Sequence, residues 1–572
     1  MDESLYSAFA EIVKQYPDHE AVAELQGGIF SAITYQSLHE RVQQFAHGLR
    51  SNCAVGERIA VMLDNGSWWP TVDFAASYIG AVVVPVHTTY TAHYLDLVLR
   101  HAEPSVFVTQ KKYFEKFADK LGSFHFKQII IVDGMPLDTK GLSVMTADEV
   151  ITAGSADSEP HLGTADDVHT IVYTSGTTGV PKGVMLTHRN LISNVAGAKA
   201  FIPITPDDRF FSFMPVAHIL ERTAGQFTPL LSGAAVYYAR GRDTLVEDMQ
   251  AAQPTVVVSV PRIFEKAHEK IIERFTNHAL THGLLKQAQK IARKSQRGIM
   301  NALDKVQFAL FDKIIFAKIR AIFGGRLRFA VSGGASLGKH VAVFFEELGI
   351  IIVEGYGLTE TSPIVTLNTL QQRKPGTVGL PMHGVDVKLD QTGEILVRGS
   401  GLMKGYYQAP DITAERIDSE GYLHTGDLGS FDTDGFLTIV GRRSEMIVLS
   451  TGRNIFPVPI EQAIEESKYI AQAMVCGDNQ KAIAALIVPE FEVLEAWCKE
   501  QGISYRLPEV LGEQRVLDLF KGEITKMVSH LQHFEQARDF KLVAEEWTQE
   551  NEMLTPSLKL KRGIIMSKST FK

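Results

Sequence analysis

Short runs of β-branched residues alternate with longer amphipathic stretches along most of the chain. Four of these runs predict buried strands: residues 58–63, 128–132, 168–173 and 255–260. Helical spacing of apolar residues fills intervals between them, for example over residues 35–50. Alternation of this kind is typical of parallel sheets that carry helices on their faces. The pattern therefore predicts an α/β fold.

The pattern changes at Gly379, where short strands and glycine turns replace the long helices. Short strands separated by glycine turns predict a small β-rich subdomain over residues 379–441. A strand-like run then ends at Gly441-Arg442, and a smaller α/β stretch follows to Lys572. We place a domain boundary at this point.

The longest apolar run covers about residues 75–86 and contains Gly80 and Pro85. It is shorter than the roughly 20 residues that a membrane-spanning helix needs, and buried β-structure is the better interpretation. The first residues are acidic and lack the apolar core of a signal peptide, so we expect a cytoplasmic protein.

Composition narrows the class of protein. The 572 residues are 45% hydrophobic and 22% charged, which is ordinary for a globular chain and excludes a disordered one. The net charge of −9 gives no general basic field, so we expect no nucleic-acid partner. Three cysteines without CxxC spacing argue against a zinc site or a disulfide framework and fit a reducing compartment.

One segment departs from this acidic average. Residues 281–330 hold eleven Lys or Arg and only Asp304 and Asp312, a net charge of +9. Apolar residues recur at helical spacing within it: Phe308, Phe311, Ile315, Ile319 and Ile322. The segment is either a folded insert with a solvated basic face, the account slightly favoured, or a docking surface for anionic membrane. The second account would place the protein at the inner face of the membrane.

Candidate chemistry begins at the end of a predicted strand. Residues 173–183 read YTSGTTGVPKG, so hydroxyls, glycines and a lysine follow one another as in a loop that grips phosphate. The lysine is followed by glycine rather than Ser or Thr, which excludes a Walker A loop. A flexible linker is the alternative. The candidate phosphate-binding residues are Thr174, Ser175, Gly176, Thr177, Thr178, Gly179 and Lys182.

With this loop the sequence resembles the adenylate-forming superfamily, which contains acyl-CoA synthetases, carrier-protein-loading adenylation domains and firefly-type luciferases. The resemblance covers nearly the whole chain in the family's order. Five further motifs carry it: Ser332-Gly333-Gly334-Ala335-Ser336, Glu354-Gly355-Tyr356-Gly357-Leu358-Thr359-Glu360, the stretch from Gly393-Glu394-Ile395 to Gly405-Tyr406, His424-Thr425-Gly426-Asp427 with Gly441-Arg442, and Thr555 to Arg562 around Lys559.

The resemblance implies roles for the nucleotide-binding residues. Tyr356 would stack on adenine beside Gly357, and the loop of Gly334, Ala335 and Ser336 would line the adenine edge. Asp427 would bind both ribose hydroxyls, and Arg442 would reach the ribose and phosphate. A turn residue is the alternative for Asp427, because Thr-Gly-Asp is good turn chemistry.

The same resemblance implies the catalytic groups. Thr359 would contact the α-phosphate, Glu360 would hold Mg²⁺, with Ser175 as a further candidate metal ligand, and Lys559 would be the catalytic lysine. His218 would lie beside the acyl carboxylate. Each role has a structural alternative: a helix cap for Glu360, a solvated basic face for Lys559, and a buried core histidine for His218.

The implied architecture is a large N-terminal domain of stacked α/β sheets with the β-rich subdomain, followed by a small mobile C-terminal α/β domain. We assign residues 1–441 to the large domain, 442–446 to a hinge and 447–572 to the lid. Ser444 occupies the pivot position, where relatives usually carry Asp or Lys, so the pivot itself stays open.

Residues 260–266, the insert after them and residues 484–489 resemble the long-chain fatty acyl-CoA synthetase branch. The implied function is ATP-dependent activation of a long-chain fatty acid and its transfer to CoA, with ATP and CoA as cosubstrates and Mg²⁺ as cofactor. Loading of a carrier protein uses the same adenylation residues and is the first alternative. A luciferase-like monooxygenase is the second.

Overall fold

The computed structural model describes residues 4–154, 159–161, 163–174, 181–241, 243–276, 279–549, 551–555 and 559–569. The chain forms two compact units. The first contains Met1–Lys388, Leu396–His424 and Phe431–Thr438, and the second contains Leu389–Ile395, Thr425–Ser430 and Ile439–Lys572. The strands of one four-stranded sheet are thus divided between the two units.

The first unit holds an eight-stranded sheet in the order β19-β9-β8-β4-β3-β5-β6-β7. The neighbours from β8 to β7 are parallel, whereas β9 and β19 add antiparallel strands at one edge. The strands are β3 (Arg58–Met62), β4 (Val82–Pro85), β5 (Val106–Thr109), β6 (Gln128–Ile131), β7 (Val144–Thr146), β8 (Val168–Thr174), β9 (Lys182–Thr187) and β19 (Gly405–Tyr406). The helices of this stretch are α1 (Leu5–Gln15), α2 (Tyr35–Leu49), α3 (Trp68–Ile79), α4 (Ala92–Ala102), α5 (Lys111–Leu121) and α6 (Ala147–Ala153).

A nine-stranded sheet forms the other half of this unit, in the order β16-β15-β14-β13-β12-β10-β11-β1-β2. Its centre from β14 to β1 is parallel, and antiparallel strands complete both edges. The strands are β1 (Glu20–Gln26), β2 (Ile29–Thr34), β10 (Arg209–Ser212), β11 (Ala235–Tyr238), β12 (Val256–Ser259), β13 (Phe329–Ser332), β14 (Ile351–Gly357), β15 (Ile364–Leu367) and β16 (Leu380–Pro381). Its helices include α7 (His188–Phe201), the π-helix η1 (Glu221–Phe227), α8 (Thr228–Leu230), α9 (Leu245–Ala252) and α14 (Lys339–Glu347).

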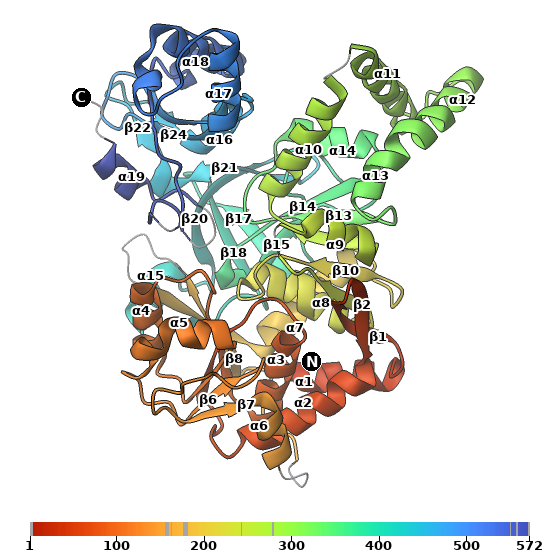
Figure 1. Cartoon of the computed structure of the whole chain (residues 1–572), viewed down its shortest axis with the longest axis vertical. Helices are drawn as coiled ribbons and strands as arrows, with labels where there is room; N and C mark the ends of the chain where they lie inside the picture. The colour runs from red at the N-terminus through yellow and green to blue at the C-terminus, as the bar shows by residue number, and fades with distance from the viewer. Residues whose placement is uncertain are drawn as a thin grey trace. The chain divides into compact units, whose positions relative to one another are not determined.

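The basic segment makes up most of a run of helices between β12 and β13 (Figure 1). The run comprises α10 (Pro261–Thr276), α11 (Ala279–Gln296), α12 (Ala302–Phe311), the π-helix η2 (Asp312–Phe316) and α13 (Ala317–Ile322). Phe311, Ile315 and Ile319 are buried in a core that also contains Phe344 and Phe345 of α14. The predicted apolar helical face is therefore confirmed as a packing face. Nowhere in the described part of the chain does a helix combine the length and apolarity that a membrane crossing requires.

The second unit has its own apolar core around a three-stranded sheet in the order β24-β25-β26. These strands are β24 (Ile470–Cys476), β25 (Ala484–Pro489) and β26 (Asp539–Leu542), accompanied by the hairpin of β22 (Ile447–Val448) and β23 (Asn454–Ile455). The helices are α16 (Pro457–Glu465), α17 (Phe491–Glu500), α18 (Gln514–Met527) and α19 (Arg562–Lys568). The divided sheet, in the order β17-β18-β20-β21, consists of β17 (Val385–Leu389), β18 (Glu394–Gly399), β20 (Leu423–Phe431) and β21 (Leu437–Arg442), and α15 (Pro410–Arg416) lies between β19 and β20 in the chain.

The α/β fold class is confirmed, and the four predicted strands correspond to β3, β6, β8 and β12. The expectation of β-structure over residues 75–86 is wrong in its first half, because this part belongs to helix α3. Gly80 ends that helix with φ of 73°, and the strand β4 follows. Nearly every residue of α3 is buried, so the helix carries no polar face from which its period could be read.

A buried ion pair joins the two large sheets of the first unit. Arg222 of η1 pairs with Asp73 of α3, and both side chains are fully buried. The same guanidinium donates to the Thr170 hydroxyl in β8 at 2.8 Å, and Gln226 donates to Asp73 at 2.7 Å. Burial alone would raise the pKa of Asp73, but Arg222 and His169 hold that pKa below its usual range. The carboxylate therefore stays ionised and satisfied in the interior.

We expect Arg222→Met to destabilise the protein by about 3–5 kcal/mol, because the substitution leaves Asp73 buried without a partner. Urea unfolding followed by circular dichroism measures the change. Arg189→Met is the matched control, since Arg189 pairs with the exposed Asp166 at 2.7 Å and such a pair is worth at most about 1 kcal/mol. Equal shifts of the urea midpoint for the two variants would contradict the role assigned to the buried pair.

Candidate active site

The two ends of the candidate phosphate loop lie side by side in the structure. Thr174 ends β8 and is paired in register with Lys182, which begins β9. The antiparallel pairing thus closes a short loop beyond the carboxyl end of a parallel strand, a usual place for ligands in α/β sheets. The predicted loop residues Ser175, Gly176, Thr177, Thr178 and Gly179 lie outside the described residues.

Tyr406 connects the loop lysine with the predicted metal ligand. The Lys182 ammonium lies 5.6 Å from the centre of the Tyr406 ring, and the Tyr406 hydroxyl donates to Glu360 Oε1 at 2.8 Å. Burial and the adjacent Glu360 carboxylate raise the pKa of Tyr406, so the phenol keeps its proton and remains a donor. The structure therefore brings together a cation and a carboxylate on two sides of one aromatic ring.

The turn that carries Thr359 and Glu360 is held from several sides. It is the single-turn helix η3 (Thr359–Thr361) between β14 and β15, and its N-cap is Leu358 rather than Glu360. Asn194 of α7 donates to the carbonyls of Thr361 and Ile364, at 3.1 and 2.8 Å. These bonds fix the backbone of the turn, so the Glu360 carboxylate is presented from a rigid support.

The predicted adenine-binding residues lie at one edge of the nine-stranded sheet. Gly334, Ala335 and Ser336 follow β13, whereas Tyr356 and Gly357 end β14, and these two strands are parallel neighbours. Their carboxyl ends therefore meet at the same edge. Gly334 has φ of 83°, which favours glycine, and the Tyr356 side chain is half-buried.

Steric crowding explains why residue 357 is a glycine. A Cβ atom on Gly357 would lie 1.7 Å from the carbonyl oxygen of Pro363, far inside contact distance. This carbonyl also accepts hydrogen bonds from the Leu358 amide at 3.1 Å and from the Thr361 hydroxyl at 2.6 Å. The close approach of the two backbone segments thus shapes the turn that holds Glu360.

His218 lies near a second histidine that sequence reasoning missed. The imidazole centres of His218 and His87 are 6.4 Å apart, and His87 follows β4 in the other sheet of the unit. Burial, with a smaller contribution from His218, lowers the pKa of His87 to about 3, so this ring is neutral. Asn65 supports the loop before His218 by donating to the Met214 carbonyl at 2.6 Å.

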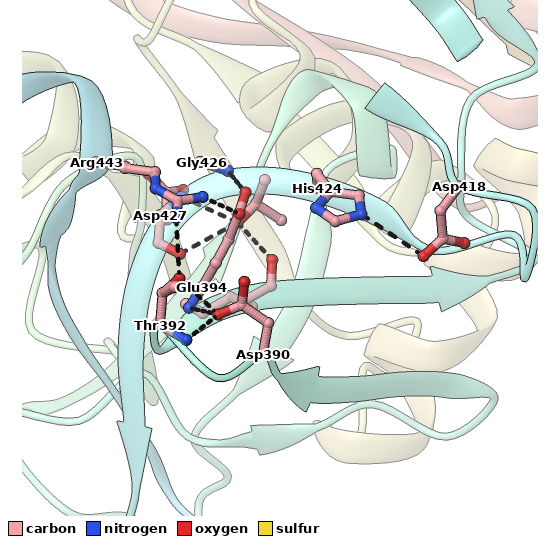
Figure 2. Close-up of polar contacts among 10 residues, drawn as sticks. Asp390, Thr392, Glu394, Asp418, His424, Gly426, Asp427 and Arg443 are labelled. Atoms are coloured by element: carbon pink, nitrogen blue, oxygen red, sulfur yellow. Dashed lines mark hydrogen bonds and ion pairs between the residues drawn. The ribbon is translucent and has the colours of Figure 1, made fainter. Parts of the chain in front are cut away.

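In the second unit the structure brings Asp427 and Arg442 together. Asp427 lies in β20 and accepts from Arg442 Nε of β21 at 2.8 Å, so it is a strand residue rather than a turn residue. Glu394 lies beside them: it accepts from the Gly426 amide at 2.8 Å and from Arg443 at 2.9 Å (Figure 2). The cluster thus holds two buried carboxylates, those of Asp427 and Glu394, beside the guanidinium groups of Arg442 and Arg443.

Lys559 lies in a loop anchored to the body of the second unit. Its amide donates to the Thr555 hydroxyl at 3.0 Å, and its carbonyl accepts from the Thr555 amide at 2.8 Å. The neighbouring Arg562 makes two bonds with Glu461 of α16, at 2.6 and 2.7 Å. Arg562 is thus a structural residue, whereas Lys559 is exposed. Ser444, the predicted pivot, is exposed in the short helix η4 (Arg443–Glu445).

No group of three or more His, Cys, Asp or Glu side chains in the described ranges could hold a metal ion. Glu360 therefore stands as a single carboxylate candidate. Cys53, Cys476 and Cys498 are free cysteines.

Comparison with known proteins defines the class. The family described as AMP-binding enzyme matches residues 9–407, and the AMP-binding enzyme C-terminal domain matches residues 444–511. Among curated proteins, the long-chain-fatty-acid–CoA ligase FadD15 of Mycobacterium bovis is 33% identical over 96% of this chain and 93% of its own length. The peroxisomal long chain acyl-CoA synthetase 7 of Arabidopsis thaliana is 31% identical over 98% and 84%.

Solved structures agree at the level of the fold. The A domain of carboxylic acid reductase from Segniliparus rugosus, in complex with AMP and a carboxylic acid, has a TM-score of 0.77 at 23% identity and covers 99% of this chain, with 92% of its own length matched. The anthranilate CoA ligase AuaEII, in complex with anthranoyl-AMP, has a TM-score of 0.76 at 17% identity, over 99% and 97%. The chain belongs to the AMP-binding enzyme family, and the predicted membership of the adenylate-forming superfamily is confirmed.

Three features of the site escaped sequence reasoning. Tyr406 was expected only as part of a structural motif, although the pairing of β19 with β9 places it beside Lys182. His87 and the Glu394–Arg443 pair come from segments far apart in the chain. A histidine directly after a buried strand was the one available signal for His87.

We expect Gly357→Ala to displace the turn that carries Glu360, because the new methyl group must move the Pro363 carbonyl. Overpacking of this kind typically costs about 1–3 kcal/mol. The melting temperature should fall, and so should the affinity for nucleotide measured by calorimetry. Gly512→Ala is the control, since nothing lies within 4 Å of its added Cβ. A Gly357 variant that unfolds and binds like the Gly512 variant would show that the turn has room.

Proposed function

We propose that this protein is an AMP-forming long-chain fatty acid–CoA ligase. In the first step the fatty acid carboxylate attacks the α-phosphorus of ATP, which forms acyl-AMP and releases pyrophosphate. In the second step the CoA thiol attacks the acyl carbon, which forms the thioester and releases AMP and a proton. The observation that carries the proposal is the arrangement of Lys182 and Glu360 about Tyr406, in a chain whose relatives match over nearly its full length.

Charge neutralisation is the main requirement of the first step. A negative carboxylate must approach a negative triphosphate, and the leaving pyrophosphate gains charge in the transition state. Lys182, at the end of the phosphate loop, supplies one cation, and Thr174, at the other end, supplies a hydroxyl donor. Thr359 lies beside Glu360 on the rigid turn η3 and can donate to the α-phosphate.

Glu360 suits a magnesium ion that arrives with ATP. Mg²⁺ is usually held by one or two carboxylates together with substrate phosphates, and a single carboxylate on a rigid turn matches this donor set. Because Tyr406 donates to Oε1, the orientation of the carboxyl group is fixed. Glu360 would hold the ion, whose charge would offset part of the negative charge of the phosphates. Ser175, in the phosphate loop after β8, is a second candidate ligand.

The nucleoside contacts follow from the two clusters already described. Tyr356 can stack on adenine beside the loop of Gly334, Ala335 and Ser336. Asp427 can accept from both ribose hydroxyls, and the bond from Arg442 holds its carboxylate in position for this. Each contact uses a residue that lies in a strand or directly follows one.

The acyl group meets a different environment. His218 and the neutral His87 would lie near the acyl carboxylate, where the neutral ring of His87 avoids a fixed counter-charge that would compete with the phosphate cations. The long tail contributes binding energy through burial, at about 0.8 kcal/mol per CH₂ group. Such a substrate needs an apolar channel rather than a few specific polar contacts.

The second step requires a different set of side chains to face the reacting atoms. We propose that residues 1–441 act as the large domain and that the lid of residues 447–572 rotates about residues 442–446, with Ser444 near the pivot. A rotation would withdraw Lys559 after adenylation and admit CoA. Hinges need only residues that tolerate a change of φ and ψ, which an exposed serine does.

A carrier protein is the alternative acceptor. One relative of Arabidopsis thaliana, 29% identical over 97% of this chain and 84% of its own length, is named long-chain-fatty-acid–[acyl-carrier-protein] ligase AEE15, chloroplastic. Turnover with free CoA, compared with turnover on a phosphopantetheine-bearing carrier protein, separates the two. The assay should use a panel of acids from acetate to long chains and measure AMP and pyrophosphate. Oxygen-dependent light or CO₂ release would instead indicate a monooxygenase.

We expect Lys559→Ala to slow adenylate formation by about 10²–10³-fold while sparing thioester formation from supplied acyl-adenylate. Loss of one preorganised charge-stabilising group has this magnitude. Single-turnover measurements of each half-reaction test it. Lys561→Ala, two residues further along, is the matched control and should keep both rates. Equal loss of both half-reactions in Lys559→Ala would refute the assignment.

We expect Glu360→Gln to raise the Mg²⁺ concentration needed for half-maximal turnover by at least tenfold, because the amide carries no charge for a hard cation. Tyr406→Phe removes only the hydrogen bond and should give a smaller shift in the same direction. Glu420→Gln is the control, since this exposed glutamate pairs with Lys388 at 3.1 Å. A Mg²⁺ dependence unchanged in Glu360→Gln would remove Glu360 as the ligand.

A further inference from the structure

Helix α12 and the π-helix η2 expose a stripe of large apolar side chains. The exposed fractions are 65% for Leu303, 68% for Val306, 55% for Leu310 and 50% for Ile314, and Ile299 just before the helix is 62% exposed. The spacing of three and four residues places Leu303, Val306, Leu310 and Ile314 on one helical face, and Ile299 precedes the helix. We call these five residues the exposed stripe.

The exposed stripe is distinct from the apolar face that holds the insert on the protein. Phe311, Ile315 and Ile319 point into the core, and α12 packs against α11. The helix is thus apolar on two faces, and packing within the described chain buries only one of them. A helix in water normally keeps its second face polar, so a contiguous apolar face of this kind marks a contact surface.

The segment that carries the exposed stripe is rich in basic side chains. Several cations of the segment have structural roles: Lys294 pairs with Asp304 at 2.7 Å, Arg320 pairs with Asp312 at 2.8 Å, and Arg293 pairs with Glu347. Both acidic residues of the segment are consumed by these pairs. Seven further cations are exposed, and the structure records no ion pair for them among its described residues. Five of them lie in or between α11, α12 and η2, namely Lys286, Lys290, Arg297, Lys305 and Lys313, and the other two are Lys318 and Arg326.

We propose that the exposed stripe and these five cations form a docking surface for an anionic lipid bilayer. An amphipathic helix with apolar residues on one side and Lys or Arg along its border lies in the plane of the interface. Its apolar side chains enter the boundary between headgroups and acyl chains, while the ammonium and guanidinium groups contact the anionic headgroups. The positive segment opposes the −9 charge of the whole chain, so this surface faces the bilayer in preference to others.

Charge also decides against a second copy of the chain as the occupant. A two-fold contact through the exposed stripe would bring the basic border of one copy against that of the other, and like charges across an interface are unfavourable. An anionic surface satisfies both the apolar and the basic parts of the patch. The inference concerns this surface alone and does not depend on the reaction that the protein catalyses.

Vesicle sedimentation with the full-length protein tests the proposal. The wild type should sediment with mixed phosphatidylglycerol and phosphatidylcholine vesicles and at least tenfold less with phosphatidylcholine alone. Release in about 0.5 M salt should be incomplete, because salt screens the charges but leaves the apolar contacts. Binding that is equal on the two kinds of vesicle, or no binding to either, would overturn the proposal.

Two triple variants separate the apolar from the charged contribution. Leu303→Ser with Val306→Ser and Leu310→Ser should reduce partitioning at least tenfold, and so should Arg297→Gln with Lys305→Gln and Lys313→Gln, since each cation near an anionic surface contributes about fivefold. The matched controls change equally exposed residues elsewhere: Ile29, Val55 and Leu137 to Ser, and Lys481, Lys499 and Lys521 to Gln.

Circular dichroism confirms that every variant is folded. If the control variants lose as much vesicle binding as the test variants, the loss does not depend on the position of the substitutions. The proposal of a docking surface at the exposed stripe would then be wrong. Sedimentation velocity without lipid tests whether the exposed stripe instead mediates self-association. A wild-type dimer that the Leu303, Val306 and Leu310 variant converts to monomer would assign the exposed stripe to self-association instead.

Discussion

The fully buried ion pair between Asp73 and Arg222 is the interaction on which the first unit depends. It links helix α3, the π-helix η1 and strand β8, and so it ties the eight-stranded sheet to the nine-stranded one. Each sheet carries part of the candidate site. Thr174 lies four residues beyond Thr170 on β8, and His218 precedes Arg222 by four residues. A desolvated charge pair tolerates little displacement, since either ion alone in the interior would be costly.

Much of the fold could be predicted because its signals are local. β-branched runs become β3, β6, β8 and β12, and the helical spacing over residues 35–50 becomes α2. Helix α3 escaped because burial on all sides removes the polar face by which a helix is recognised. The exposed stripe escaped for a related reason. Apolar residues at helical spacing are usually assigned to the core, and only the structure shows that α12 has two such faces.

The candidate site was predictable in its residue types but not in its contacts. Motif order indicates Lys182, Glu360 and Asp427, because each lies in a short segment of unusual composition. The partners come from elsewhere: Tyr406 reaches Glu360 only because β19 pairs with β9, and Arg442 reaches Asp427 through the neighbouring strand. Nor does sequence separate the cations with structural roles, such as Arg293 and Arg562, from exposed ones such as Lys559. Those distinctions depend on long-range packing.

The two bonds between Arg562 and Glu461 have a consequence for timing. They fasten the segment after Lys559 to helix α16, and the bonds between Lys559 and Thr555 close the loop on itself. The lysine is therefore not at the end of a free tether that searches space by itself. Its loop is held on the second unit, so under the proposed rotation the lysine would reach the phosphate together with that unit. Any process that controls the movement of the second unit would then also determine when Lys559 acts in the catalytic cycle.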